Sequence, residues 1–110
     1  MTTIKDVILS LPTLFKPEKA KGWNRVIVFD LQGEEPSKWT LTIENGVATV
    51  EEGATKTPKL TIIGNSEYIV QMFTGETPPM KLVNAKLLKM QGPMMDAIAF
   101  SGLWNLPKKY

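Results

Sequence analysis

Two alternating segments joined by the Asn45-Gly46 dipeptide constrain the fold of this 110-residue chain more than any other feature. Trp39, Leu41 and Ile43 alternate with polar residues, which is the pattern of a strand with one buried face. Asn-Gly is the strongest short-range hairpin signal, because both central positions of the turn need positive φ, which these residues tolerate. Residues 47–51 are therefore expected to return antiparallel to this strand.

A third strand precedes this hairpin. Residues 26–31 are rich in branched side chains, and Ile27, Phe29 and Leu31 share one face of the expected strand. A turn at residues 33–36 separates this strand from the next one. Residues 26–51 therefore predict a three-stranded antiparallel meander.

Helical patterns flank and follow the meander. Ile4, Val7, Ile8 and Leu11 recur at helical spacing after a capping-box-like Thr3 and Asp6, and Lys16-Pro17 ends this helix. The second half predicts, in order, a strand (59–63), a helix (66–73) stopped by Thr74-Gly75, a short helix opened by Pro79, a strand (86–91) and an apolar segment (94–106). This order predicts one α+β domain over residues 1–110, with a five-stranded, mostly antiparallel sheet and helices on one face. The places of the fourth and fifth strands in the sheet stay open.

The chain contains no His and no Cys, which excludes the usual catalytic triads, thiol nucleophiles and zinc sites. Its Glu pairs (34–35 and 51–52) lie beside turn residues and are interpreted as solvated charge. No Walker loop or dinucleotide fingerprint is present. We therefore expect a protein that is not an enzyme, with no catalytic residue, no metal ligand and no cofactor; a carboxylate-only mechanism or a magnesium site is the alternative.

Hydropathy and charge set the expected environment. No apolar run reaches the ~20 residues of a membrane span, and no secretory signal is visible, so a cytoplasmic protein is expected. Five Lys stand against one acid in residues 81–110, while six acids stand against one Lys in residues 30–52. We interpret these as solvated faces; transient contact with an anionic membrane surface is the alternative. The absence of a zinc finger or of an aromatic-and-basic stacking motif argues against nucleic acid.

The segment 94–106 is too apolar for a surface helix. Its apolar side chains would spread around more of a helix than one core-facing stripe needs. Such a helix lies between protein layers, covers a ligand, or forms a homodimer interface.

Four motifs in order resemble those of the sterol carrier protein type 2 family. They are Trp39-Thr-Leu-Thr-Ile-Glu-Asn-Gly46, Pro58-Lys-Leu-Thr-Ile62, Met72-Phe-Thr-Gly75 followed by Pro79, and Leu88-Lys-Met-Gln-Gly92. The resemblance covers residues 26–106. Three features depart from the pattern. Lys86 stands where a Gly often precedes the fifth strand, this strand reads Leu87-Leu88-Lys89-Met90 without the leading Lys, and the C-terminal Ser-Lys-Leu address of some members is missing.

The resemblance implies an apolar tunnel between the sheet and the helices. Family members bind fatty acids, acyl-CoA, sterols or phospholipids and move them without covalent chemistry. The candidate tunnel residues are apolar side chains of the second half: Met72, Phe73, Leu82, Val83, Met94, Met95, Ile98, Leu103 and Trp104. Taken singly, each is better explained as part of the core. Lys81, Lys86 and Lys89 are interpreted as solvated, with a role at the tunnel mouth as the alternative.

These observations lead to two functional hypotheses. The first is non-catalytic binding and transfer of a small apolar lipid in an internal tunnel. The second is an accessory or scaffolding subunit that binds a protein partner, or dimerises, through the same apolar face.

Overall fold

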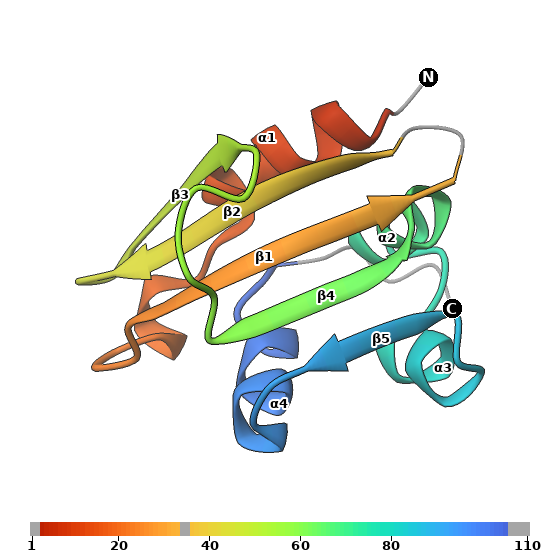
Figure 1. The fold of residues 1–110 in the computed structure, drawn as a ribbon. Helices are drawn as coiled ribbons and strands as arrows, with labels where there is room; N and C mark the ends of the chain where they lie inside the picture. Colours follow the sequence, from red (N-terminus) through yellow and green to blue (C-terminus); the bar gives the residue numbers. More distant parts are fainter. Residues whose placement is uncertain (1–2, 34–35, 106–110) are drawn as a thin grey trace.

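The computed structural model describes residues 3–33 and 36–105, which form a mixed five-stranded sheet with the order β3-β2-β1-β4-β5 (Figure 1). The strands are β1 (Arg25–Gln32), β2 (Ser37–Glu44), β3 (Val47–Glu52), β4 (Leu60–Asn65) and β5 (Leu88–Gln91). The helices are α1 (Ile4–Leu14), α2 (Ser66–Phe73), α3 (Pro79–Asn84) and α4 (Met94–Ser101), with a short 3-10 helix, η1 (Pro17–Lys19). All neighbouring strands are antiparallel except β1 and β4, which are parallel. The predicted α+β class is confirmed.

The predicted meander is present. β2 and β3 pair around Asn45 and Gly46, whose φ angles of 52° and 76° are those of a type I′ hairpin turn. At the N-terminus, Thr3 and Asp6 form the predicted capping box of α1, and Ile4, Val7, Ile8 and Leu11 are buried. The chain leaves α1 in extended conformation at Phe15, before the Lys16-Pro17 pair.

The helices cover one face of the sheet. On that face Phe29 of β1 contacts Phe73 of α2 and Phe100 of α4, with ring centroids 6.4 and 6.1 Å apart. Trp104 packs edge-on against both Phe73 and Phe100. The aromatic cluster therefore joins α2, α4 and β1 into one core.

The connection from β3 to β4 covers the opposite face of β2. Since β3 is an edge strand and β4 lies beside β1, residues 53–59 cross the sheet, as the loop in front of the strands shows (Figure 1). Thr40 donates a hydrogen bond from Oγ1 to the carbonyl oxygen of Gly53 (2.6 Å) and accepts one from the Thr55 N–H (3.0 Å). Both Thr40 and Thr42 are buried. The prediction that β2 buries only one face is therefore wrong, because this loop covers the other.

Several predicted boundaries also shift. The apolar segment was expected to be helical to residue 106, but α4 ends at Ser101; residues 103–105 then run back along α1, where Phe15 and Trp104 form an isolated bridge. Leu106 lies outside the described residues. β5 begins at Leu88 rather than at Lys86, because Lys86 takes a φ of 61° and belongs to the turn that ends α3.

Candidate functional site

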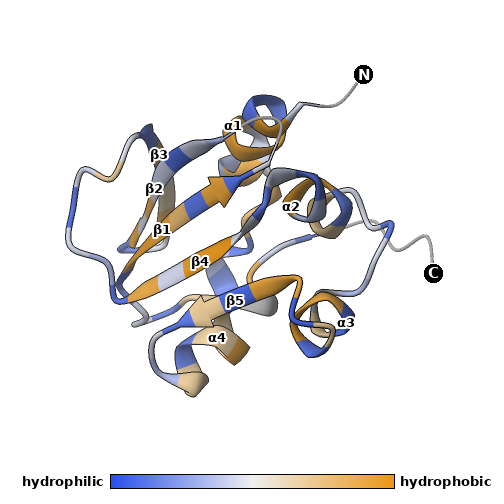
Figure 2. Cartoon of the chain, turned by 45° about the vertical axis from the view of Figure 1, so that its right-hand side comes forward, coloured by the Kyte–Doolittle hydropathy of each residue, from blue (hydrophilic) through white to orange (hydrophobic). Residues whose placement is uncertain are grey.

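An apolar groove of about 800 Å³ lies among α3, β5 and α4. Both helices flank β5 on the side away from β4 in the two views, and α4 is coloured largely as apolar (Figures 1 and 2). The groove is lined by Met80, Val83, Lys86, Leu88, Lys89, Met90, Gly92, Met94, Ala97 and Ile98. Its volume lies within the range of about 300–1,000 Å³ that is typical of small-molecule pockets.

The wall formed by α3 depends on an unusual helix end. The Lys86 N–H donates to the Val83 carbonyl oxygen (3.0 Å), and the Leu87 N–H donates to the Leu82 carbonyl oxygen (2.9 Å). These two bonds make a Schellman motif, whose left-handed residue is usually Gly. Here that residue is Lys86, the position where the sequence departs from the family pattern. The motif turns the chain into β5 and leaves the Lys86 side chain at the groove.

β5 forms the second wall and is the edge strand of the sheet. Leu88 is buried and Met90 half-buried, while Lys89 between them is exposed. Gly64 of β4 pairs with Leu88, and a Cβ at Gly64 would collide with that side chain. Gly92, with a φ of 145°, brings its Cα so close to β4 that a Cβ would lie 2.6 Å from the Lys59 carbonyl oxygen. Glycine is therefore required where β5 approaches β4 and where the chain turns into α4.

The third wall is α4, whose apolar side chains divide between the core and the groove. Phe100 is buried, Ala97 is half-buried, and Met94 and Ile98 are 77% and 59% exposed. This arrangement explains why the segment is too apolar for a surface helix: one part packs against the sheet while another lines an open groove.

The structure divides the nine predicted site residues into three groups. Val83, Met94 and Ile98 line the groove. Met95 is 75% exposed on α4 and lies outside the groove lining. The other five are buried in the core: Met72, Phe73, Leu82, Leu103 and Trp104. A tunnel between sheet and helices is not shown.

Sequence reasoning missed several apolar residues of the lining. Met80, Leu88, Met90 and Ala97 were assigned to helices or strands but not to the site. The alternation of Leu88 and Met90 was the available signal, because it places both side chains on one face of the predicted strand. The edge position of β5 is known only from the structure.

The groove carries positive charge. Among the lining residues that the structure describes, Lys86 and Lys89 are charged and none is acidic. Among the described residues, no carboxylate lies within 4.0 Å of either ammonium group. Both charges are therefore left to solvent or to a ligand.

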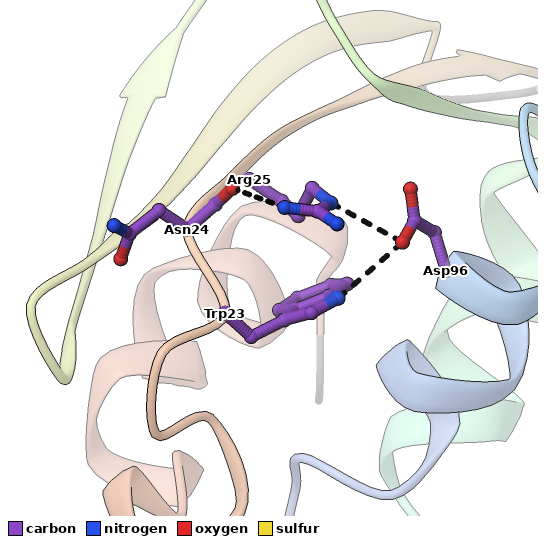
Figure 3. Close-up of polar contacts among 4 residues, drawn as sticks. All are labelled: Trp23, Asn24, Arg25 and Asp96. Atoms are coloured by element: carbon purple, nitrogen blue, oxygen red, sulfur yellow. Dashed lines mark hydrogen bonds and ion pairs between the residues drawn. The ribbon is translucent and has the colours of Figure 1, made fainter.

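The one acid of α4 is engaged elsewhere. Asp96 is buried and accepts hydrogen bonds through Oδ1 from the Trp23 Nε1–H (3.3 Å) and the Arg25 Nε–H (3.2 Å) (Figure 3). The Arg25 guanidinium also lies 5.3 Å from the centre of the Trp23 ring, within cation–π range. This Trp23–Arg25–Asp96 cluster, which the sequence analysis did not predict, ties α4 to the start of β1.

Other features of the described residues offer little for chemistry. No group of three or more acidic residues is placed to hold a metal ion within residues 3–33 and 36–105. In the same ranges, no helix is both long and apolar enough to cross a membrane. A second, more open hollow of about 470 Å³ lies at Arg25, Thr42 and Lys56, and polar and charged side chains form much of its lining.

Comparisons with known proteins agree with this architecture. The model of the SCP-2 sterol transfer family matches residues 7–105. Hydroxysteroid dehydrogenase-like protein 2 of Xenopus tropicalis is 27% identical over 92 residues, which are 83% of this chain and 22% of that protein. The chain thus spans about a fifth of the length of this curated relative.

Solved structures share the fold at low identity. The sec-alkylsulfatase Pisa1 from Pseudomonas sp. matches with a TM-score of 0.75 and 18% identity, over 89% of this chain and 16% of that one. Sterol carrier protein 2 from Aedes aegypti, in complex with palmitate, matches with a TM-score of 0.65 and 12% identity, over 97% of this chain and 100% of that one. The fold and the match of the family model over residues 7–105 together show that this chain belongs to the SCP-2 sterol transfer family.

Proposed function

We propose that this protein binds and transfers a small apolar lipid without catalysing a reaction. The observation that carries the proposal is the groove of about 800 Å³ among α3, β5 and α4, lined by Met, Leu, Val and Ile side chains. Methionine adapts its shape to irregular apolar ligands, and Met80, Met90 and Met94 contribute to the lining. The palmitate complex of the Aedes aegypti protein supports an acyl chain as the ligand.

Burial of apolar surface supplies the driving force. Each CH₂ group removed from water contributes about 0.8 kcal/mol. A chain that buries about ten such groups gains roughly 8 kcal/mol, which corresponds to about micromolar affinity before association costs are subtracted. Neither His nor Cys is available to attack a bound ester or thioester, so binding without turnover is the expected outcome.

Two exposed residues on α4 provide a matched test. Ile98 lines the groove and is 59% exposed, whereas Met95 on the same helix is 75% exposed and lies outside the lining. A lipid at a hundredfold excess over its Kd should stabilise the parent protein by about 2.7 kcal/mol. Ile98→Trp should fill part of the groove and abolish this shift in melting temperature, while Met95→Trp should keep it.

The ligand panel for this test contains a fatty acid, an acyl-CoA, a sterol and a phospholipid. A parent protein whose melting temperature responds to none of them would contradict the proposal. An equal loss of response in Ile98→Trp and Met95→Trp would show that the groove is not the binding site.

The exposed part of α4 favours a second candidate function, that of an accessory subunit. Met95 is 75% exposed and lies outside the groove lining, so a lipid in the groove would leave it uncovered. A partner protein, a second copy of the chain, or an anionic membrane surface during transfer would each cover it. Loss of dimer in Met95→Glu by sedimentation would support dimerisation. Slower transfer to anionic vesicles by that variant, with unchanged lipid binding, would support membrane contact.

A further inference from the structure

We propose that Lys86 and Lys89 select ligands with an anionic head group on an apolar tail, in preference to neutral molecules of the same shape. The inference rests on the proposed lipid-binding function and assigns the head-group preference to two residues of the groove. Both lysines belong to the lining, and the other lining residues within 3–33 and 36–105 are uncharged.

Two cationic residues border the groove on adjoining parts of the chain. Lys86 lies in the turn between α3 and β5, and Lys89 lies on β5. No carboxylate of the described residues compensates either of them, and Asp96 of α4 is already held by Arg25 and Trp23. A ligand that places an anion beside them gains charge-assisted hydrogen bonds beyond the burial of its tail.

The backbone of Lys86 is strained. Lys86 has a φ of 61° at a position where Gly carries no steric penalty. A long cationic side chain is therefore placed at a backbone position that disfavours it. A cation near a helix C-terminus also gains from the helix dipole, but α3 has six residues and Lys81 already lies in its last turn. Of Lys81 and Lys86, it is the strained Lys86 that lines the groove.

A pair of fluorescent probes with the same tail separates tail binding from head-group recognition. cis-Parinaric acid and its methyl ester differ in the negative charge, and both report binding to the intact protein by fluorescence. At mildly alkaline pH and low salt, we expect the acid to bind about fivefold more tightly than the ester, since a partly exposed ion pair contributes a factor of about two to five. Added salt should reduce this ratio.

Substitutions at Lys86 and Lys89 test whether these two residues cause the preference for the acid over the ester. Lys86→Gln and Lys89→Gln should each lower the ratio of acid to ester affinity, and the double variant should bring it close to one with little change in ester affinity. Lys86→Gly should lower the ratio as Lys86→Gln does while relieving the backbone strain. Lys81→Gln is the matched control, because Lys81 is exposed on α3 but outside the groove lining.

The outcomes are distinct. If neither probe binds the parent protein, both the lipid-binding function and this inference are overturned. If both probes bind the parent with equal affinity, or if the double variant keeps the preference, only the head-group inference is overturned. An equal effect of Lys81→Gln would also overturn it, because general surface charge would then explain the preference.

Discussion

Lys86 lines the groove and has a left-handed backbone conformation that is unfavourable for a residue with a side chain. Stability measurements can isolate the free energy of this strain. Non-glycine residues lose about 1–2 kcal/mol in the left-handed conformation, and Gly recovers part of this despite its more flexible unfolded state. We expect Lys86→Gly to stabilise the empty protein by about 1 kcal/mol, or roughly 4–8 °C in melting temperature.

Lys86→Ala is the control for this prediction. It removes the charge but keeps a Cβ at the φ of 61°, so its stability should stay within about 0.5 kcal/mol of the parent. Equal stabilisation by Ala and Gly would mean that charge repulsion, rather than backbone strain, is relieved. Urea denaturation of the three proteins makes the comparison.

At the scale of elements, the Trp23–Arg25–Asp96 cluster positions α4, and its two charged members should not be equivalent. The Asp96 side chain is 6% exposed, while that of Arg25 is 32% exposed. Removing the arginine leaves a buried carboxylate without a countercharge, whereas removing the acid leaves a cation that can turn toward water. We expect Arg25→Met to destabilise the protein by roughly 2 kcal/mol and Asp96→Asn by about 1 kcal/mol.

The double variant tests whether the two effects are coupled. Once Asp96 is neutral, Arg25→Met should cost much less than it does in the parent, and a thermodynamic cycle from denaturation curves measures the difference. Additive effects of the two substitutions would contradict the assigned contact between β1 and α4.

The elements themselves could largely be predicted from sequence, because their signals are local. Asn45-Gly46 fixed one hairpin, and the capping box fixed the start of α1. The burial of Thr40 could not be predicted, because the loop that covers it follows from the parallel pairing of β1 with β4, and no nearby residue encodes that pairing.

The candidate site was harder to predict for a related reason. On a helix that is apolar around much of its circumference, periodicity cannot tell which side faces the core. Contacts with the distant residues Arg25 and Phe29 orient α4, whereas Trp104 lies beyond the end of this helix and pairs with Phe15, so neither position could be predicted from a helix expected to reach residue 106. The structure places Ile98 at the groove and Trp104 in the core.

At the scale of the whole molecule, the sheet has two parts with different connectivity. β1, β2 and β3 pair with their neighbours in sequence, while β4 and β5 join them through one parallel pair that brings Ile27 beside Leu60. The groove belongs entirely to the second part, since α3, β5 and α4 form all its walls. The walls of the candidate site therefore come from the second half of the chain.

β5 is a four-residue strand paired along one edge only, and this has a kinetic consequence. Short edge strands detach in fluctuations that leave the central strands intact. Amide hydrogen exchange should therefore be faster at Leu88 and Met90 than at Leu41, and a bound lipid should slow it selectively in β5. Exchange in β5 as slow as in β2 without lipid would contradict this expectation. If the expectation holds, a lipid in the open groove loses part of its contact surface each time β5 detaches, so a more stable β5 should lengthen the residence time of the lipid.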